Sequence, residues 1–217
     1  KPKVLVPVHF SGQPCDMEQI HHLAKEHDIT IVEDASHAIG AEYKGERIGS
    51  CKYSDMTVFS FHPVKIITTG EGGMVLTNNP DLYEKLRLYR SHGITRDPNL
   101  MSNNDGSWYY EQIDLGYNYR VTDMQAALGT SQMKCLPEFL QRRRYLAKRY
   151  NELLADLPLT LPYQIEGTNS SWHLYVACFR EDASLTKKER LFQEMKKHGI
   201  TLNMHYIPVH LQPYYQN

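Results

Sequence analysis

Several features that the 217-residue sequence lacks exclude whole classes of function. The formal net charge is only -1, so the chain has no basic field that would favour nucleic acid or acidic lipid as a partner. No apolar run is long enough to cross a bilayer as a helix. The four cysteines form no CxxC pair, which argues against a zinc site or a disulfide framework and favours free thiols in a reducing cytoplasm.

The chain also lacks a typical start and end. It begins at Lys1 without an initiator methionine, shows no signal peptide, and stops soon after Tyr215 without a closing helix. We therefore expect a segment of a longer protein. The composition is otherwise ordinary, since 41% hydrophobic and 23% charged residues are typical of a globular protein with one large or two small domains.

The first half of the chain alternates between predicted strands and helices, which indicates an α/β fold. Residues 29–33 and 56–61 are apolar with little alternation, as in parallel strands that are buried on both faces. Residues 4–9 and 73–77 are shorter predicted strands, and residues 43–49 are a predicted hairpin. Helices are predicted after Asp16 and from Pro80. We expect a mainly parallel sheet flanked by helices.

Between residues 94 and 157 the chain is predicted to contain a long loop and helices in place of alternating strands and helices. Residues 94–113 are expected to form a long loop, followed by a helix that Thr122 caps and a charged helix from Pro137 to about Leu157. The basic run Arg142–Arg144 is interpreted as a solvated helix face or a partner contact.

The sequence after residue 158 predicts part of a smaller α+β domain. The predicted elements are a strand over 172–179, a helix that starts with a capping box at Thr186 and Glu189, and a strand over 201–206. The boundary is expected near residue 136. Residues 1–136 would then be the C-terminal portion of the large domain, and residues 137–217 the linking helix and the partial small domain.

A carboxylate and a lysine follow the two best-defined predicted strands. Asp34 ends the strand over 29–33, and Lys65 follows the strand over 56–61, at the strand ends where α/β sheets bind ligands. Enzymes that use pyridoxal phosphate (PLP) need a lysine that forms a Schiff base with the cofactor and an acid that pairs with its pyridine nitrogen. A partly desolvated lysine has a depressed pKa and becomes a usable nucleophile and base.

Further polar residues lie close to this pair in the sequence. We expect His37 to contact the cofactor ring or its hydroxyl and Ser60 to contact the phosphate, with the glycine-rich residues 70–73 nearby. Taken singly, a lysine after a strand is usually a surface residue and an aspartate at a strand end usually forms a turn. The joint arrangement favours the cofactor interpretation.

Four motifs carry a resemblance to a known family. They are EDASHA at Glu33–Ala38, SFHPVK at Ser60–Lys65, TGEGG at Thr69–Gly73 and GYNYR at Gly116–Arg120. With them, essentially the whole chain resembles the DegT/DnrJ/EryC1/StrS sugar aminotransferases. The resemblance implies a fold-type-I PLP enzyme that acts on nucleotide-linked keto sugars.

The resemblance also implies roles for cofactor-binding residues. Lys65 matches the Schiff-base lysine, and Asp34 matches the partner of the pyridine nitrogen. His37 stands where many relatives have a glutamine beside the ring, and Ser60 matches a phosphate contact. Asn118 matches an asparagine that reaches across a dimer interface to the phosphate of the neighbouring subunit, so the resemblance implies a homodimer with a shared active site.

The implied reaction transfers the amino group of L-glutamate to a nucleotide-linked 4-keto-6-deoxy sugar, UDP-linked, in surface-glycan biosynthesis. His62 and His205 fall in motifs near the substrate cleft of the family. No metal site is predicted, because a pair such as His205 and His210 has no evident third ligand.

Two alternatives remain open. In PLP-dependent sugar dehydratases on the same scaffold a histidine replaces the lysine, so Lys65 argues against that reaction. A non-catalytic nucleotide-sugar-binding or regulatory relative would have no use for the set Asp34, Ser60, Lys65 and Asn118. Relatives also carry, before the position of Lys1, a helix N-terminus that cradles the phosphate and an aromatic residue that stacks on the ring. We therefore expect the 217-residue chain alone to bind PLP weakly or not at all.

Overall fold

A computed structural model describes residues 1–180 and 184–216. The chain divides into two compact units. The first comprises Lys1–Ala155 and Leu161–Val176, and the second comprises Asp156–Thr160 and Ala177–Asn217. The domain boundary predicted near residue 136 falls inside a long helix of the first unit, and the assignment of these units to a large and a small domain stays a prediction.

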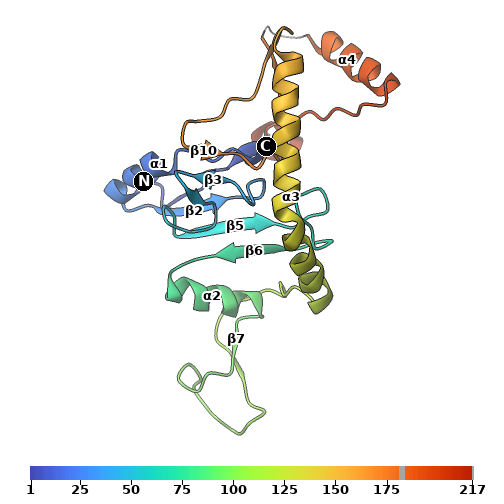
Figure 1. The fold of residues 1–217 in the computed structure, drawn as a ribbon. Helices are drawn as coiled ribbons and strands as arrows, with labels where there is room; N and C mark the ends of the chain where they lie inside the picture. The colour runs from blue at the N-terminus through green and yellow to red at the C-terminus, as the bar shows by residue number, and fades with distance from the viewer. Residues whose placement is uncertain (181–183, 217) are drawn as a thin grey trace. The chain divides into compact units, whose positions relative to one another are not determined.

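The first unit is built on a four-stranded sheet in the order β1-β2-β5-β6 (Figure 1). Its strands are β1 (Val4–Leu5), β2 (Thr30–Asp34), β5 (Met56–Ser60) and β6 (Gly73–Leu76). β1 and β5 run parallel to β2, whereas β6 is antiparallel to β5. The prediction of an α/β fold with a mainly parallel sheet is confirmed. The strand predicted over 4–9 is shorter, although Val8 makes a further parallel bridge to Asp34.

Two helices of this unit begin where the sequence predicts them. α1 (Met17–His27) begins after Asp16, whose side chain accepts a hydrogen bond from the Gln19 N–H, and α2 (Pro80–Arg90) has proline at its first position. The predicted hairpin consists of β3 (Glu42–Tyr43) and β4 (Glu46–Arg47), and β10 (Thr168–Asn169) pairs with β3. A 3-10 turn, η1 (Phe10–Gly12), lies between β1 and α1.

The two helices predicted around Pro137 are one helix, α3 (Asp123–Leu154), so that prediction was wrong. A proline inside a helix costs about 3 kcal/mol, but Leu136 and Leu140 bury their side chains in the core on either side of it and offset that cost. Thr122 caps the helix as predicted, with Gln125 completing a capping box. None of the helices in the described part of the chain is both long and apolar enough to cross a bilayer.

The loop predicted over 94–113 is closed at its base by two short strands. β7 (Ile94–Thr95) pairs with β8 (Glu111–Gln112) in antiparallel register. Next to this pair, Gly93 has a positive φ of 69°, and a Cβ placed on it would lie 1.9 Å from the Asp114 carbonyl oxygen. Only glycine fits this close approach of two backbone segments.

In the second unit, β9 (Leu159–Thr160) pairs antiparallel with β11 (Cys178–Phe179), followed by α4 (Leu185–Lys197), η2 (Val209–Leu211) and η3 (Pro213–Tyr215). The predicted helix is present, but Ser184 caps it instead of Thr186, because the Ser184 hydroxyl accepts from the Lys187 N–H. The strand predicted over 201–206 was wrong, since none of the described residues pairs with this stretch.

The strand predicted over 172–179 is reduced to β11. Its first residues instead lie on the η1 turn of the first unit, where Ser171 N–H donates to the Gly12 carbonyl and Leu174 N–H to the Ser11 carbonyl. Trp172 adopts a positive φ of 51°, which breaks the extended backbone that a strand requires.

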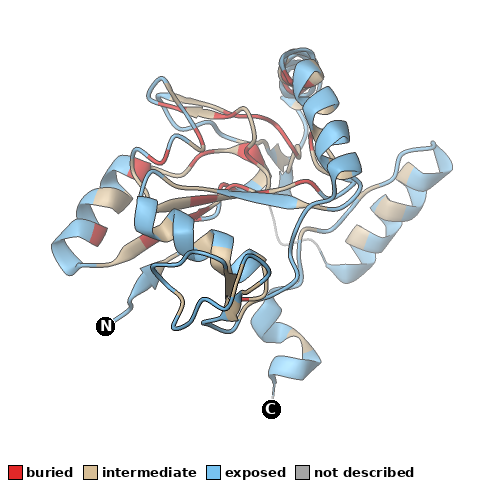
Figure 2. Ribbon diagram, turned by 90° about the horizontal axis from the view of Figure 1, so that it is seen from below, coloured by how far each residue is buried: buried red, intermediate tan, exposed pale blue. Residues whose placement is uncertain are grey.

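The buried positions gather along β2, β5 and the segments that cover them (Figure 2). Among them is a polar network around His9 and Glu33, which are 0% and 3% exposed. His9 Nε2 lies 2.7 Å from Glu33 Oε2, and the Cys15 N–H donates to His9 Nδ1 at 3.1 Å. The Ser54 and Thr57 hydroxyls donate to the other Glu33 oxygen. Burial alone would raise the pKa of Glu33, but the hydrogen bonds from His9, Ser54 and Thr57 lower it below its usual value.

Replacing Glu33 with alanine is expected to destabilise the first unit by about 3 kcal/mol, because His9, Ser54 and Thr57 would lose a buried acceptor. Urea unfolding at neutral pH measures this loss. Since the pKa of Glu33 is depressed in the folded state, its contribution is present above the unfolded pKa of about 4.5 and is lost as the pH falls through the folded value.

The matched control is Glu18→Ala, which removes an exposed ion pair with Lys44 and should change stability little. Equal losses for the two variants would contradict the structural role of the buried network.

Candidate active site

The loop that connects β5 to β6 holds Lys65 in a defined place. Lys65 N–H donates to the His62 carbonyl oxygen at 2.9 Å and closes a turn. The ends of the loop are tied together, because Thr69 N–H donates to the Phe61 carbonyl and Phe61 N–H to the Gly72 carbonyl. Lys65 is half-buried in this arrangement. The lysine therefore emerges from a compact loop at the carboxyl end of β5.

Asp34 is fixed at the carboxyl end of the neighbouring strand. Its N–H donates to the Pro7 carbonyl at 2.9 Å, and its carbonyl accepts from the His9 N–H at 3.0 Å. One side-chain oxygen accepts from the Ser36 N–H at 3.0 Å, which orients the carboxylate. Because β2 and β5 are parallel, the ends of both strands lie at one edge of the sheet.

The two charged groups act on each other. Burial lowers the pKa of the Lys65 ammonium below its usual value, and the charge of Asp34 partly offsets this by raising it. A lysine amine with a depressed pKa is a better nucleophile and base at neutral pH. The structure thus brings together the two residues on which the predicted chemistry depends.

His37 lies in a cluster made by three separate parts of the chain. The Ser11 N–H donates to His37 Nδ1 at 3.2 Å, and the Ser171 hydroxyl donates to the His37 carbonyl at 2.9 Å. The ring of His173 is 4.4 Å from the His37 ring, measured between centroids. Sequence reasoning singled out His37 but assigned no role to Ser11, Ser171 or His173. The run SWHLY at Ser171–Tyr175 combines polar and aromatic residues, but the sequence does not indicate which part of the chain it contacts.

Ser60 and His62 belong to the same strand end and loop as Lys65. Ser60 is the last residue of β5, opposite Gly73, and its hydroxyl accepts from the His62 N–H at 3.4 Å. His62 is exposed, with Nδ1 accepting from the Val64 N–H at 3.3 Å and Nε2 3.8 Å from a Glu71 oxygen. Both residues therefore lie at the same end of β5 as Lys65.

Asn118 and His205 are not joined to this group. Asn118 is exposed and its backbone bridges to Ser91, and no hydrogen bond links its side chain to another residue in the described parts of the chain. His205 belongs to the second unit, where its ring lies 4.1 Å from that of Tyr206. The roles of both residues stay predictions.

Two arginines of the basic run on α3 hold the segment that contacts His37. Arg143 donates to the Trp172 and His173 carbonyls at 3.0 and 3.1 Å, and Arg144 to the Ser170 and Gly40 carbonyls. Burial lowers the pKa of Arg143. The interpretation of this run as a solvated face therefore holds only for Arg142, which is exposed and lies over the Tyr145 ring.

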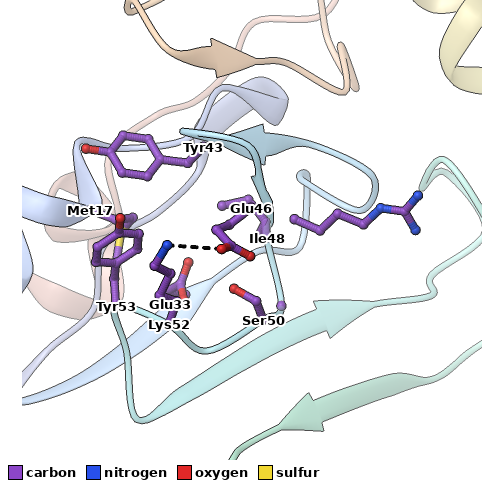
Figure 3. A pocket seen from close by; sticks show the side chains of 10 residues that line it. Met17, Glu33, Tyr43, Glu46, Ile48, Ser50, Lys52 and Tyr53 are labelled. Atoms are coloured by element: carbon purple, nitrogen blue, oxygen red, sulfur yellow. Dashed lines mark hydrogen bonds and ion pairs between the residues drawn. The ribbon is translucent and has the colours of Figure 1, made fainter.

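A small pocket lies elsewhere on the first unit, beside the β3–β4 hairpin (Figure 3). Glu33 lines it, and Lys52 spans its rim with Nζ 3.0 Å from Glu46 Oε1. Neighbouring residues on a strand point to opposite faces, so this pocket and Asp34 lie on opposite faces of β2. Within residues 1–180 and 184–216, no three His, Cys, Asp or Glu side chains gather as a metal-binding group.

Comparison with known proteins identifies related sequences. The model of the DegT/DnrJ/EryC1/StrS aminotransferase family matches residues 1–217. The chain is 39% identical over 211 residues to a UDP-4-amino-4,6-dideoxy-N-acetyl-beta-L-altrosamine transaminase of Campylobacter jejuni, covering 96% of this chain and 53% of the relative. The chain spans about half the length of the curated relatives it matches, between 53% and 55%.

Solved structures that resemble this chain are also aminotransferases. Helicobacter pylori PseC, an aminotransferase involved in the biosynthesis of pseudoaminic acid, is 34% identical with a TM-score of 0.86, covering 97% of this chain and 54% of that one. The putative sugar aminotransferase Spr1654 from Streptococcus pneumoniae, in its PLP-form, is 33% identical with a TM-score of 0.85, covering 99% and 57%. The predicted aminotransferase fold is confirmed.

Replacing Asp34 with asparagine is expected to lower the pKa of the Lys65 amine further, because the charge that favours the ammonium is removed while burial remains. The pH dependence of Lys65 modification by an amine-reactive reagent, followed by peptide mass spectrometry, measures this shift. Asp97→Asn in the β7–β8 loop is the control. An unchanged or raised pKa in Asp34→Asn would contradict the coupling.

Replacing Arg143 with methionine is expected to lower stability by about 2 kcal/mol, because two buried carbonyls would lose a charged donor. Arg142→Met on the next position of α3 should have a smaller effect, since Arg142 is exposed. Thermal or urea unfolding of the two variants compares them. The assignment fails if Arg142→Met proves the more damaging change.

Proposed function

Because the chain belongs to the DegT/DnrJ/EryC1/StrS aminotransferase family, we propose that it supplies the catalytic lysine of a PLP-dependent nucleotide-sugar aminotransferase. The observation that carries this proposal is the half-buried Lys65 beside Asp34, with a pKa that burial depresses. Relatives support it, because Spr1654 is described in PLP and PMP forms and the Campylobacter jejuni relative is named a transaminase.

The residues present fit PLP chemically. Lys65 offers an amine of depressed pKa, and Asp34 offers a carboxylate whose orientation the Ser36 N–H fixes. Both lie at the carboxyl edge of the sheet, where His37 and Ser60 add an imidazole and a hydroxyl. Asp34 would pair with the pyridine nitrogen, Ser60 would contact the phosphate, and His37 would lie against the ring or its hydroxyl.

The bound cofactor would supply an electron sink for the pair of electrons released at the substrate carbon. Lys65 Nζ would hold the cofactor, and its free amine would accept a proton from the substrate carbon and donate it back to another carbon of the bound group. The Asp34 carboxylate would stabilise positive charge on the pyridine nitrogen that it would face. Because burial lowers the pKa of Lys65, a larger fraction of its amine is in the neutral, nucleophilic form than in an exposed lysine.

The proposed amino donor is L-glutamate, and the proposed acceptor is a UDP-linked 4-keto-6-deoxy N-acetyl sugar. The names of the two relatives support a sugar acceptor of this kind, since they place those proteins in altrosamine transamination and pseudoaminic acid biosynthesis. The L-glutamate donor rests on the family resemblance. We therefore propose a role in pseudaminic acid or related surface-glycan biosynthesis. His62 and His205 are the proposed sugar contacts.

The proposed assembly is a homodimer with a shared site. Asn118 is exposed, as a residue that reaches into a neighbouring subunit must be. We place the protein in the cytoplasm, in keeping with four free cysteines.

The test is the visible absorption spectrum of the full-length protein with PLP, before and after L-glutamate. We expect a cofactor band that glutamate removes and that is absent in Lys65→Ala, because only Lys65 supplies the amine. Lys52→Ala, an exposed lysine paired with Glu46, is the control and should keep the band.

Mass spectrometry of the UDP-sugar product then separates the alternatives. An amino sugar supports the transaminase, and loss of water without nitrogen gain would indicate a dehydratase. A cofactor band that persists in Lys65→Ala would overturn the assignment of the lysine.

A further inference from the structure

The imidazole of His37 receives a hydrogen bond from the protein backbone on one edge. Ser11 N–H donates to His37 Nδ1 at 3.2 Å, between residues 26 positions apart in the chain. A ring nitrogen that accepts from an N–H carries no proton of its own. In neutral His37 the proton must therefore lie on Nε2, the nitrogen on the opposite edge of the ring.

The orientation of the Ser11 N–H is set by a turn whose backbone conformation few residue types can adopt. Ser11 has a φ of 60° and Gly12 a φ of 100°, both in the left-handed region. A Cβ placed on Gly12 would lie 2.5 Å from the Ser171 hydroxyl and 2.8 Å from the Trp172 nitrogen. The turn is thus built directly against the Ser170–His173 segment, and glycine is needed for the contact.

The Ser170–His173 segment also contacts the backbone carbonyl and the ring face of His37. The Ser171 hydroxyl donates to the His37 carbonyl at 2.9 Å, and the His173 ring lies 4.4 Å from the His37 ring at an interplanar angle of 42°. Arg143 in turn fixes the carbonyls of Trp172 and His173. Backbone and ring of His37 are both held, so the imidazole has little freedom to turn its other edge toward Ser11.

We propose that the Ser11 N–H, on the turn supported by Ser171 and His173, sets the tautomer of His37 and makes it an N–H donor through Nε2. Ser11 and Gly12 are then positioning residues for the site. What His37 donates to rests on the proposed function, in which an oxygen of the cofactor ring is the acceptor.

The first test uses the full-length protein without PLP, labelled with nitrogen-15. Long-range imidazole proton–nitrogen correlation spectra distinguish the two tautomers, and the spectrum of His37→Gln identifies the His37 signals by their loss. We expect the proton of neutral His37 on Nε2. A proton on Nδ1 would overturn the proposal.

The role of the turn is tested with a matched pair of glycine variants. Gly12→Ala pushes the turn off the Ser170–His173 segment, and we expect signals of the second His37 tautomer to appear. Gly45→Ala introduces a side chain at a similar positive φ of 81°, with no atom within 4 Å, and should leave the tautomer unchanged. An unchanged His37 spectrum in a folded Gly12→Ala protein would contradict the role of the turn. If that variant does not fold, the wild-type spectrum still decides the tautomer.

The consequence for the site is measured as PLP affinity. His37→Gln keeps an N–H donor and His37→Leu does not, so His37→Leu should bind PLP about tenfold more weakly than His37→Gln. Equal affinities would contradict the donor role. These affinities are measured on the full-length protein. If the full-length wild-type protein fails to bind PLP, the proposed function fails, while the tautomer measured in the PLP-free protein stands on its own.

Discussion

Parallel hydrogen bonding between β2 and β5, with Val32 opposite Met56 and Asp34 opposite Val58, is the constraint on which the site depends. Parallel strands end at the same edge of a sheet, so this register places Asp34 beside the loop that carries Lys65. The ends of this loop are hydrogen-bonded to each other, and Lys65 within it is half-buried, which lowers its pKa. The pairing of two five-residue strands thus brings to one edge of the sheet two residues that lie 31 positions apart in the sequence.

Around that edge, contacts between distant segments hold the other polar groups. On one face of β2, Glu33 is buried with His9, Ser54 and Thr57. The backbone N–H of His9 also donates to the Asp34 carbonyl. His9 therefore binds Glu33 through its side chain and the adjacent Asp34 through its backbone. The turn that follows His9 reaches His37, and the segment that packs on this turn is held by arginines of α3. The residues that hold the candidate site in place therefore come from both ends of the first unit's sequence, from residue 7 to residue 173.

The sequence predicted the parts of this arrangement that are local. The two apolar strands and the caps at Asp16 and Thr122 follow from periodicity and from capping residues. The positions of Asp34 and Lys65 at one edge of the sheet follow from where the two strands end. Pro137 misled the prediction of α3, because the burial of Leu136 and Leu140 is a tertiary effect. The role of Arg143 was missed for a related reason, since nothing in a basic run indicates which carbonyls it will meet. The predicted strand over 172–179 does not begin at Trp172, because this segment contacts the turn at Ser11 and Gly12 in the first part of the chain.

The central claim is that the Lys65 amine is the group that bonds to the cofactor. The most direct measurement is borohydride reduction of the full-length protein mixed with PLP, followed by digestion and mass spectrometry of the peptides. The account predicts one stable pyridoxyl group, attached to Lys65. A label on another lysine, or none in a protein shown to be folded, would contradict it.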